Sequence, residues 1–301
     1  MLANFFGKSK PINFIVLFGL FLGYFVLSVF SKELSFILVK EIAWFLVVFS
    51  VYNFIIAKNL LTYDNSFAFL FFVILIGFFP DTIRINNTFF ANLTVLLFLR
   101  KVYSLQSSKN VFHKLFDGGL WLGISFLIEP YTGLLILLLY LSIFLHQRFT
   151  YQTLLIPVIG IFGPLFLYFT YHFWYDKPEK FTSLFNWDFN PDLSMYLNQK
   201  LLIPIIFISF FVIISVLLKS PKAFSVKNKF RKNWILILTQ LVITTVILIL
   251  VKDDSGSEFL YVFFPLSVVL ANGIEFFQKK WYADIIILLF LIASFAMSVI
   301  L

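Results

Sequence analysis

The 301-residue chain has no cysteine, three histidines and few charged residues. Without cysteine, the protein has no disulfide, no thiolate metal site and no cysteine nucleophile. Charged residues make up 13% of the chain, against 61% for hydrophobic residues. That is too little polar surface to cover a water-soluble globule of this length. The composition therefore predicts an all-α protein that lies in a lipid bilayer.

Long apolar runs separated by short polar intervals predict about eleven membrane-spanning helices. The predicted segments are Pro11–Phe30, Ile42–Ala57, Ser66–Phe79, Thr88–Leu99, Leu115–Ile128, Tyr131–Leu145, Gln152–Tyr175, Leu201–Leu218, Trp234–Val251, Phe259–Phe277 and Ile285–Leu301. The third to sixth are shorter than the roughly 20 residues that a perpendicular span needs, so we expect them inside the bundle. The first reads as an uncleaved signal anchor. We expect residues 1–301 to form one integral-membrane domain without a soluble domain.

The charges of the loops predict one orientation. Six basic residues and no acidic one occur in Lys219–Asn233, and Arg100–Lys114 is also basic. Lys and Arg next to apolar segments stay in the cytoplasm. The two acidic loops, Asp176–Lys200 and Lys252–Glu258, then lie outside. This predicts a multi-pass protein of the bacterial cytoplasmic membrane with its N-terminus in the cytoplasm and its C-terminus outside.

The alternation of cytoplasmic and outer loops depends on a reversal of the chain at Glu129-Pro130, which we expect to be a tight outer hairpin. If it were only a kink in one long helix, both later loops would lie on the wrong side. The net charge of +8 divides by side of the membrane, so it indicates anionic lipid as a partner and no nucleic acid. His113 and His146 fall on one side and His172 on the other, so they cannot share one metal ion.

The first candidate site joins the third and fourth segments in the stretch FFPDTIRINNTFFANLT. Asp81 is a candidate general base, and the guanidinium of Arg84 is a candidate phosphate ligand. Asn86 and Asn87 carry hydrogen-bonding groups into the next helix. Alternatively, Asp81 and Arg84 form an ion pair that caps two helix ends.

The second candidate is Glu129, which lies between two apolar segments beside Tyr131. Poor solvation there would disfavour the ionised carboxylate and tune it toward general acid or base chemistry. Equally, the side chain reaches water at the tip of a hairpin.

The third candidate is the long outer loop, where Trp174 and Trp187 occur among carboxylates. Aromatic faces beside carboxylates bind sugar rings, whereas Trp at a membrane boundary is also an ordinary interfacial anchor. Asp253, Asp254 and Glu258 are expected to form a solvated acidic loop or, alternatively, a cation site. Proline and glycine at 157, 160, 163 and 164 are expected to break the seventh segment, as in the substrate paths of transporters.

The stretch from Asn86 to Tyr175 resembles the middle of GT-C polyprenol-phosphate-dependent glycosyltransferases. The resemblance rests on Arg100-Lys101, on KLFDGGLWLGISFLIEPYTGLLILLLYLSIF, on His146 to Arg148 and on the Pro/Gly-containing segment after them. It implies about eleven to thirteen spans and a site that faces away from the cytoplasm. The chain departs from that family because Ser31–Glu41 is short, where the family has a long loop with a catalytic Asp. The chain is also similar to bacterial integral-membrane proteins of unknown activity.

Two hypotheses follow. The first is a transferase that acts on a sugar linked to polyprenyl phosphate at the outer face, with its cofactor left open. Its catalytic residues would be Asp81 and Glu129, and its substrate-binding residues Arg84, Asn86, Asn87, Tyr131, Trp174 and Trp187. The second is a non-catalytic subunit of an envelope assembly or transport complex, whose partners are other membrane proteins.

Overall fold

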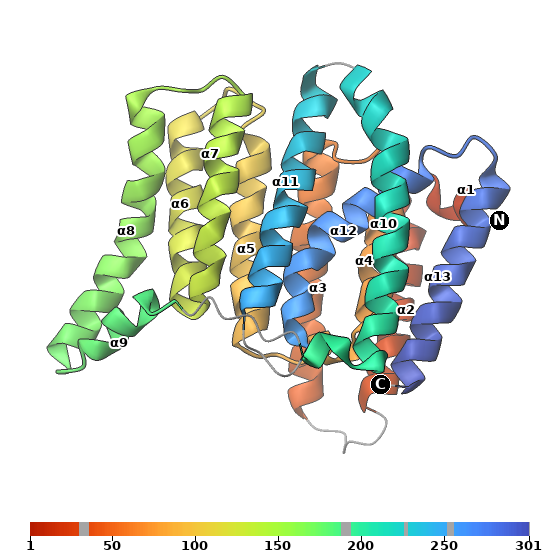
Figure 1. Ribbon diagram of the computed structural model, residues 1–301, viewed down its shortest axis with the longest axis horizontal. Helices are drawn as coiled ribbons and strands as arrows, with labels where there is room; N and C mark the ends of the chain where they lie inside the picture. Colours follow the sequence, from red (N-terminus) through yellow and green to blue (C-terminus); the bar gives the residue numbers. More distant parts are fainter. Residues whose placement is uncertain (30–35, 188–193, 226–227, 252–255, 301) are drawn as a thin grey trace. The chain divides into compact units, whose positions relative to one another are not determined.

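The computed structural model describes the chain except residues 30–35, 188–193, 226–227, 252–255 and 301 (Figure 1). The described residues form helices and turns without a strand, which confirms the all-α prediction. They divide into two compact units. Unit 1 comprises Met1–Arg84, Asp192–Leu238 and Asp253–Leu301, and unit 2 comprises Ile85–Pro191 and Thr239–Lys252.

Unit 1 is built around α4, whose twelve residues are all buried. Its helices are α1 (Leu2–Phe6), α2 (Pro11–Val29), α3 (Phe36–Asn59), α4 (Phe67–Phe78), α10 (Gln199–Ser225), the first part of α11 (Asn228–Leu250), α12 (Leu260–Ile274) and α13 (Lys280–Ile300), with the 3-10 turns η1 (Pro80–Ile83), η4 (Met195–Leu197) and η5 (Ser257–Phe259). Helices α2, α12 and α13 all contact α4. The prediction that short segments lie inside the bundle is confirmed for this helix.

Large aromatic side chains fill the core of unit 1. Phe72 of α4 is fully buried, and its ring lies 4.3 Å from Tyr52, 6.1 Å from Phe49 and 6.0 Å from Phe263. The Tyr52 hydroxyl donates to the carbonyl of Ala68 at 2.9 Å, so this buried polar group is satisfied. Rings from α3, α4 and α12 therefore interlock around one centre.

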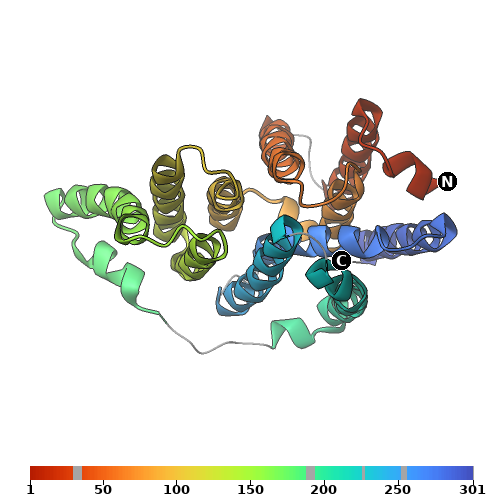
Figure 2. The same cartoon turned by 90° about the horizontal axis from the view of Figure 1, so that it is seen from above.

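Unit 2 is a bundle of helices joined by short turns. It comprises α5 (Asn87–Ser104), α6 (Val111–Ile128), η2 (Pro130–Leu135), α7 (Ile136–Leu145), α8 (Tyr151–Trp174), α9 (Glu179–Thr182), η3 (Ser183–Phe185) and the last part of α11. The yellow to green helices α5–α8 stand side by side in Figure 2, and α6 contacts both α5 and α8. The chain ends α6 at Ile128 and returns through η2 and α7, which pack against α6. The predicted reversal of the chain at Glu129-Pro130 is confirmed, and its place on the outer side stays a prediction.

Helices α6 and α8 meet along a glycine seam, formed by Gly119, Gly123, Pro157, Gly160 and Pro164. A Cβ added to Gly119 would collide with the carbonyl oxygen of Pro157, and one added to Gly160 would collide with the carbonyl oxygen of Phe116. Small residues let two backbones approach this closely in membrane proteins. The prediction that these residues break the seventh segment is wrong, because α8 runs without interruption from Tyr151 to Trp174.

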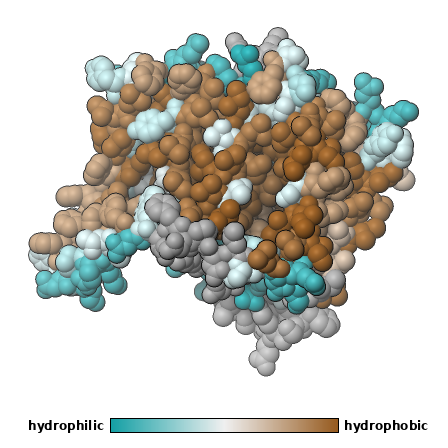
Figure 3. All heavy atoms as spheres, viewed as in Figure 1, coloured by the Kyte–Doolittle hydropathy of each residue, from teal (hydrophilic) through white to brown (hydrophobic). Residues whose placement is uncertain are grey.

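Eight helices are long and apolar enough to cross a membrane, among the residues that the structure describes. They are α2, α3, α6, α8, α10, α11, α13 and the run formed by η5 and α12. This is the pattern of a multi-pass membrane protein. On the face seen in Figure 3, hydrophobic residues cover the middles of the helices and hydrophilic residues gather at their ends.

Eleven helices of ten or more residues occur in the described ranges, and each coincides with one of the eleven predicted segments. Helices α4, α5 and α7 are not among the eight long apolar ones. The count of eleven spans, their orientation and the packing expected of GT-C proteins stay predictions.

Two hydrogen bonds show which helix ends of unit 1 lie together. At one end, the Asn233 amide donates to the carbonyl of Asn59 at 3.2 Å, and the Asn272 amide donates to the carbonyl of Leu61 at 3.1 Å. Loops predicted to share the cytoplasmic side thus gather at one end.

Candidate functional site

Asp81 lies on the short turn η1, which follows the buried helix α4, and Arg84 is the residue directly after this turn. The Arg84 Nη2 atom lies 3.1 Å from the Asp81 Oδ1 atom, and the two side chains are 58% and 47% exposed, respectively. The two residues therefore form the ion pair that the alternative interpretation expected. An arginine has five N–H donors, and this pair engages one of its nitrogens. That Arg84 also binds a phosphate stays a prediction.

Glu258 is fully buried on η5, directly before the buried helix α12. The Tyr196 hydroxyl donates to its Oε1 atom at 3.1 Å. The expected solvated loop is wrong for this residue, because the chain enters the core of unit 1 at Ser257 and takes the carboxylate with it. Asp253 and Asp254 lie outside the described residues.

The turns η1 and η5 contact each other. The ring of Phe79 stacks on that of Phe259, with centroids 3.9 Å apart and planes inclined by 12°. Tyr196 meets the same Phe259 ring edge-on at 5.9 Å. Asp81, Arg84, Tyr196 and Glu258 thus belong to one end of unit 1, which we call the η1–η5 end.

Glu129 ends α6 in unit 2 with an extended backbone, at φ −138° and ψ 101°. Its carbonyl accepts from the Thr132 hydroxyl at 2.8 Å and from the Thr132 N–H at 3.1 Å. The side chain is half-buried. The position at a hairpin is as predicted, and the catalytic role stays a prediction.

Aromatic residues of the outer loop pack against this hairpin. The Trp187 ring lies 6.0 Å from Tyr131 and 6.4 Å from Phe126, and its indole N–H donates to the carbonyl of Leu184 at 3.1 Å. Two of the predicted sugar-binding residues, Tyr131 and Trp187, are therefore neighbours. Trp174 is 81% exposed at the end of α8.

Asn86 caps α5. Its Oδ1 atom accepts from the Phe89 N–H at 2.9 Å, while Asn87 is exposed in the first turn. The predicted site residues divide between the units, with Asp81 and Arg84 in unit 1 and the others in unit 2.

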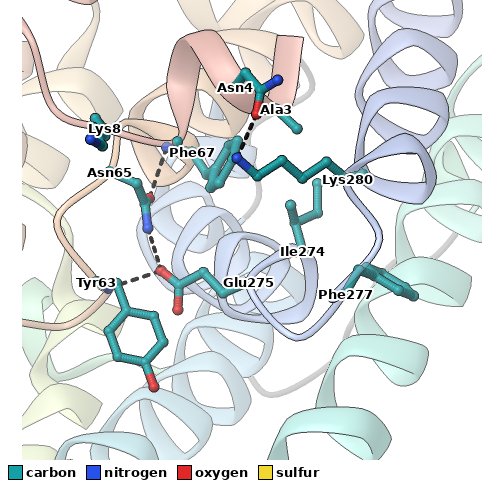
Figure 4. Close-up of a pocket in the computed structure, with 12 residues that line it drawn as sticks. Ala3, Asn4, Lys8, Tyr63, Asn65, Phe67, Ile274, Glu275, Phe277 and Lys280 are labelled. Atoms are coloured by element: carbon teal, nitrogen blue, oxygen red, sulfur yellow. Dashed lines mark hydrogen bonds between the residues drawn. The ribbon is translucent and has the colours of Figure 1, made fainter. Parts of the chain in front are cut away.

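The other end of unit 1 carries a buried ion pair that the sequence interpretation missed. Lys219 Nζ lies 3.1 Å from Glu275 Oε2, and each side chain is 3% exposed. The Asn65 amide donates to Glu275 Oε1 at 2.6 Å, and the Tyr63 N–H donates to it at 2.9 Å (Figure 4). The ammonium also lies 5.1 Å from the centre of the Phe230 ring. We call this group the Lys219–Glu275 clamp.

Beside the clamp lies a pocket of about 260 Å³ (Figure 4). Lys8, Lys280 and Asn4 line it together with Glu275, and Lys280 Nζ donates to Asn4 Oδ1 at 2.5 Å. In the sequence, Glu275 is one of the few acidic residues on the side predicted to be cytoplasmic, and this is the only sequence signal for the clamp. Since both Glu275 oxygens already have donors, the clamp joins α10, α12 and the α3–α4 loop and is structural.

In the part of the chain that the structure describes, no three His, Asp or Glu side chains are grouped so as to hold a metal ion. The His146 Nδ1 atom, directly after the end of α7, lies 2.8 Å from the carbonyl oxygen of Ser142.

Comparison with known proteins identifies a family and no activity. No curated protein and no solved structure matches the chain. Nothing in these comparisons relates it to GT-C glycosyltransferases, so that resemblance stays a prediction. One family model, described as a family of unknown function (DUF6427), matches residues 1–299. The chain therefore belongs to this family.

Proposed function

We propose that the protein is an integral-membrane transferase that moves a sugar from a polyprenyl-phosphate carrier to an acceptor hydroxyl at the outer face of the bacterial cytoplasmic membrane. The observation that best supports this is the η1–η5 end, where a buried carboxylate and a carboxylate–guanidinium pair adjoin two buried helices. Charged groups in such places are costly in membrane proteins and mark substrate paths.

The residues of this end have distinct roles in the proposal. Arg84 binds the phosphate of the carrier with the N–H groups that Asp81 leaves available. The acceptor oxygen attacks the anomeric carbon, the bond from that carbon to the phosphate oxygen breaks, and polyprenyl phosphate leaves with the bonding electrons. Asp81 takes the proton of the acceptor hydroxyl, and Glu258 keeps the site anionic behind it.

Residues of unit 2 have further roles in the proposal. Glu129 is the alternative base, and the neighbouring rings of Tyr131 and Trp187 offer apolar faces for a sugar. Asn86, Asn87 and Trp174 are retained as substrate-binding residues.

The test replaces the chromosomal gene by variants and measures the envelope glycans of the host by mass spectrometry. Asp81→Asn, Arg84→Ala, Glu258→Gln and Glu129→Gln are expected to reduce one glycan and to accumulate its lipid-linked precursor. Glu179→Gln, which alters an exposed carboxylate on α9, is the matched control. If all four variants reach wild-type amounts in the membrane and leave the glycans unchanged, the proposal fails.

A second candidate is a non-catalytic subunit of an envelope assembly or transport complex. Exposed aromatic residues at the end of α8 and in the following loop support it, namely Phe173, Trp174, Tyr175 and Phe185. Purification in a mild detergent tests it. A stoichiometric membrane-protein companion supports this role, and a lone species counts against it.

A further inference from the structure

Unit 2 contains a hollow of about 620 Å³ that no predicted site residue lines. It lies between the turn that precedes α6 and the turn that precedes α8. Its lining residues carry hydroxyl, amide, imidazole and guanidinium groups, and none is acidic: Ser108, Asn110, Val111, Phe112, His113, Gln147, Arg148, Thr150, Gln152 and Thr153.

Two long helices begin at this hollow, since the first turns of α6 and α8 both line it. Figure 1 shows both helices beginning at the same end of unit 2. On α8, the Thr150 hydroxyl accepts from the Thr153 N–H at 3.2 Å. On α6, the side chain of Asn110 makes no capping bond. First-turn N–H groups and the helix dipole favour an anion at such a place.

Arg148 supplies a full positive charge to the same hollow, and the backbone fixes its position. Gln147 adopts a left-handed conformation at φ 55°. The Arg148 N–H donates to the carbonyl of Ile143 at 3.0 Å, and its carbonyl accepts from the Thr153 hydroxyl at 2.5 Å. Within the described ranges, the Arg148 Nε atom is buried and has no hydrogen-bond partner. Because Arg148 lines the hollow, its guanidinium can donate to an anion that binds there.

The charged residues near the hollow do not cancel the positive charge of Arg148. Asp117 is engaged by Lys101, whose Nζ lies 2.5 Å from its Oδ2 atom. Lys114 Nζ donates to the carbonyls of Ser104 and Ser107 at 2.7 and 3.1 Å, which fixes a second cation near the same turn. His113 adds an imidazole to the lining.

The rim of the hollow carries exposed aromatic side chains. Phe112 lines it, and Phe149 and Tyr151 flank Thr150; all three are exposed. Aromatic residues gather at the level of lipid headgroups, at the ends of membrane-spanning helices. We propose that this hollow binds the phosphate group of an anionic phospholipid, with Arg148, His113 and the first turn of α6 as its ligands.

The test uses the purified full-length protein in detergent, with an equimolar mixture of phosphatidylglycerol and phosphatidylcholine, read by native mass spectrometry. The wild type is expected to retain phosphatidylglycerol selectively. Arg148→Gln is expected to lower this retention about tenfold or more, because charge-assisted hydrogen bonds contribute on that scale. Lys109→Gln, which removes an exposed cation of the same turn outside the lining, is the matched control and is expected to change it less than about twofold.

His113→Gln is the second variant and is used if Arg148→Gln fails to fold. The His113 side chain is exposed, so we expect its replacement to leave the fold intact. This variant is expected to lower the retention of phosphatidylglycerol more than Lys109→Gln does. Competition by millimolar inorganic phosphate identifies the source: displacement of the lipid would show a site for soluble phosphate, and no displacement supports a headgroup site. Equal retention of both lipids by the wild type, or equal losses in Lys109→Gln and the lining variants, would overturn the proposal.

Discussion

The two units are packed by different means. In unit 1, aromatic rings of α3, α4 and α12 interlock around Phe72. In unit 2, α6 and α8 approach each other along the glycine seam, where the closest neighbours of the glycines are backbone atoms and the ring of Pro164. Lipid gives apolar helices little reason to associate, so close packing must hold them together. One chain of nearly uniform composition thus uses large residues in one unit and the smallest residues in the other.

The units also differ in where they keep charged groups. Unit 1 buries the Lys219–Glu275 clamp and Glu258. Unit 2 buries neutral polar side chains such as Asn92 and Gln240, and other polar residues cap α5 and α8 and line an open hollow. Rigid burial suits a fixed structural or catalytic group, whereas an open hollow suits a ligand that exchanges with the bilayer.

The largest effect is expected from the aromatic core of unit 1. Phe72→Ala removes a fully buried ring and should lower the free energy of unfolding by about 3–5 kcal/mol. Phe210→Ala, on the exposed side of α10, should change it little. Equilibrium unfolding in mixed micelles measures both variants, and equal losses would mean that ring packing does not hold unit 1 together.

The second-largest loss of stability is expected from breaking the Lys219–Glu275 clamp. Lys219→Met leaves Glu275 buried without its cation, and we expect a loss of about 3 kcal/mol, at the lower end of the range for broken buried pairs. The loss is limited because Tyr63 and Asn65 still donate to Glu275. Lys222→Met, at an exposed site one turn further on, is the control, and the double variant with Glu275→Met should recover part of the loss. If Lys219→Met unfolds no more easily than the control, the clamp is not structural.

The glycine seam of unit 2 gives a matched pair of adjacent residues. Gly119→Ala should cost about 1–3 kcal/mol because its Cβ meets backbone. Gly118→Ala should be neutral or stabilising, since its Cβ would meet side chains at ordinary distances of 3.6 and 3.7 Å. Thermal unfolding of the two variants separates these cases, and identical shifts would contradict the seam.

The smallest effect is expected at the start of α5. Asn86→Ala removes a capping bond and should cost about 1 kcal/mol. Asn86→Asp should keep the capping bond, and Asn87→Ala should leave the free energy of unfolding unchanged. A loss of glycan product in Asn86→Asp at unchanged stability would instead point to substrate binding.

Much of the fold follows from the sequence because hydrophobic length is a local property. The eleven predicted segments coincide with eleven helices in the described chain, and the reversal at Glu129-Pro130 was required by the charges of the later loops. The burial of α4 followed from its shortness. These predictions need no knowledge of neighbours.

Tertiary partners explain the rest. Glu258 looked like a loop residue because only its contacts with Tyr196 and the adjoining turns reveal its burial. Pro157 and Pro164 looked like breaks, but membrane helices tolerate proline where neighbours compensate, and the seam shows that the nearby glycines serve packing. The Lys219–Glu275 clamp joins residues 56 positions apart, which no local pattern predicts.

The central claim is that the η1–η5 end of unit 1 faces the outside while the clamp end faces the cytoplasm. Because the chain has no cysteine, single cysteines can be labelled without background. Spheroplasts that carry Arg84→Cys or Lys222→Cys, both at exposed positions, should be treated with a membrane-impermeant maleimide. We predict labelling of Arg84→Cys in intact spheroplasts and of Lys222→Cys only after permeabilisation. Labelling of Lys222→Cys with protection of Arg84→Cys would contradict the account.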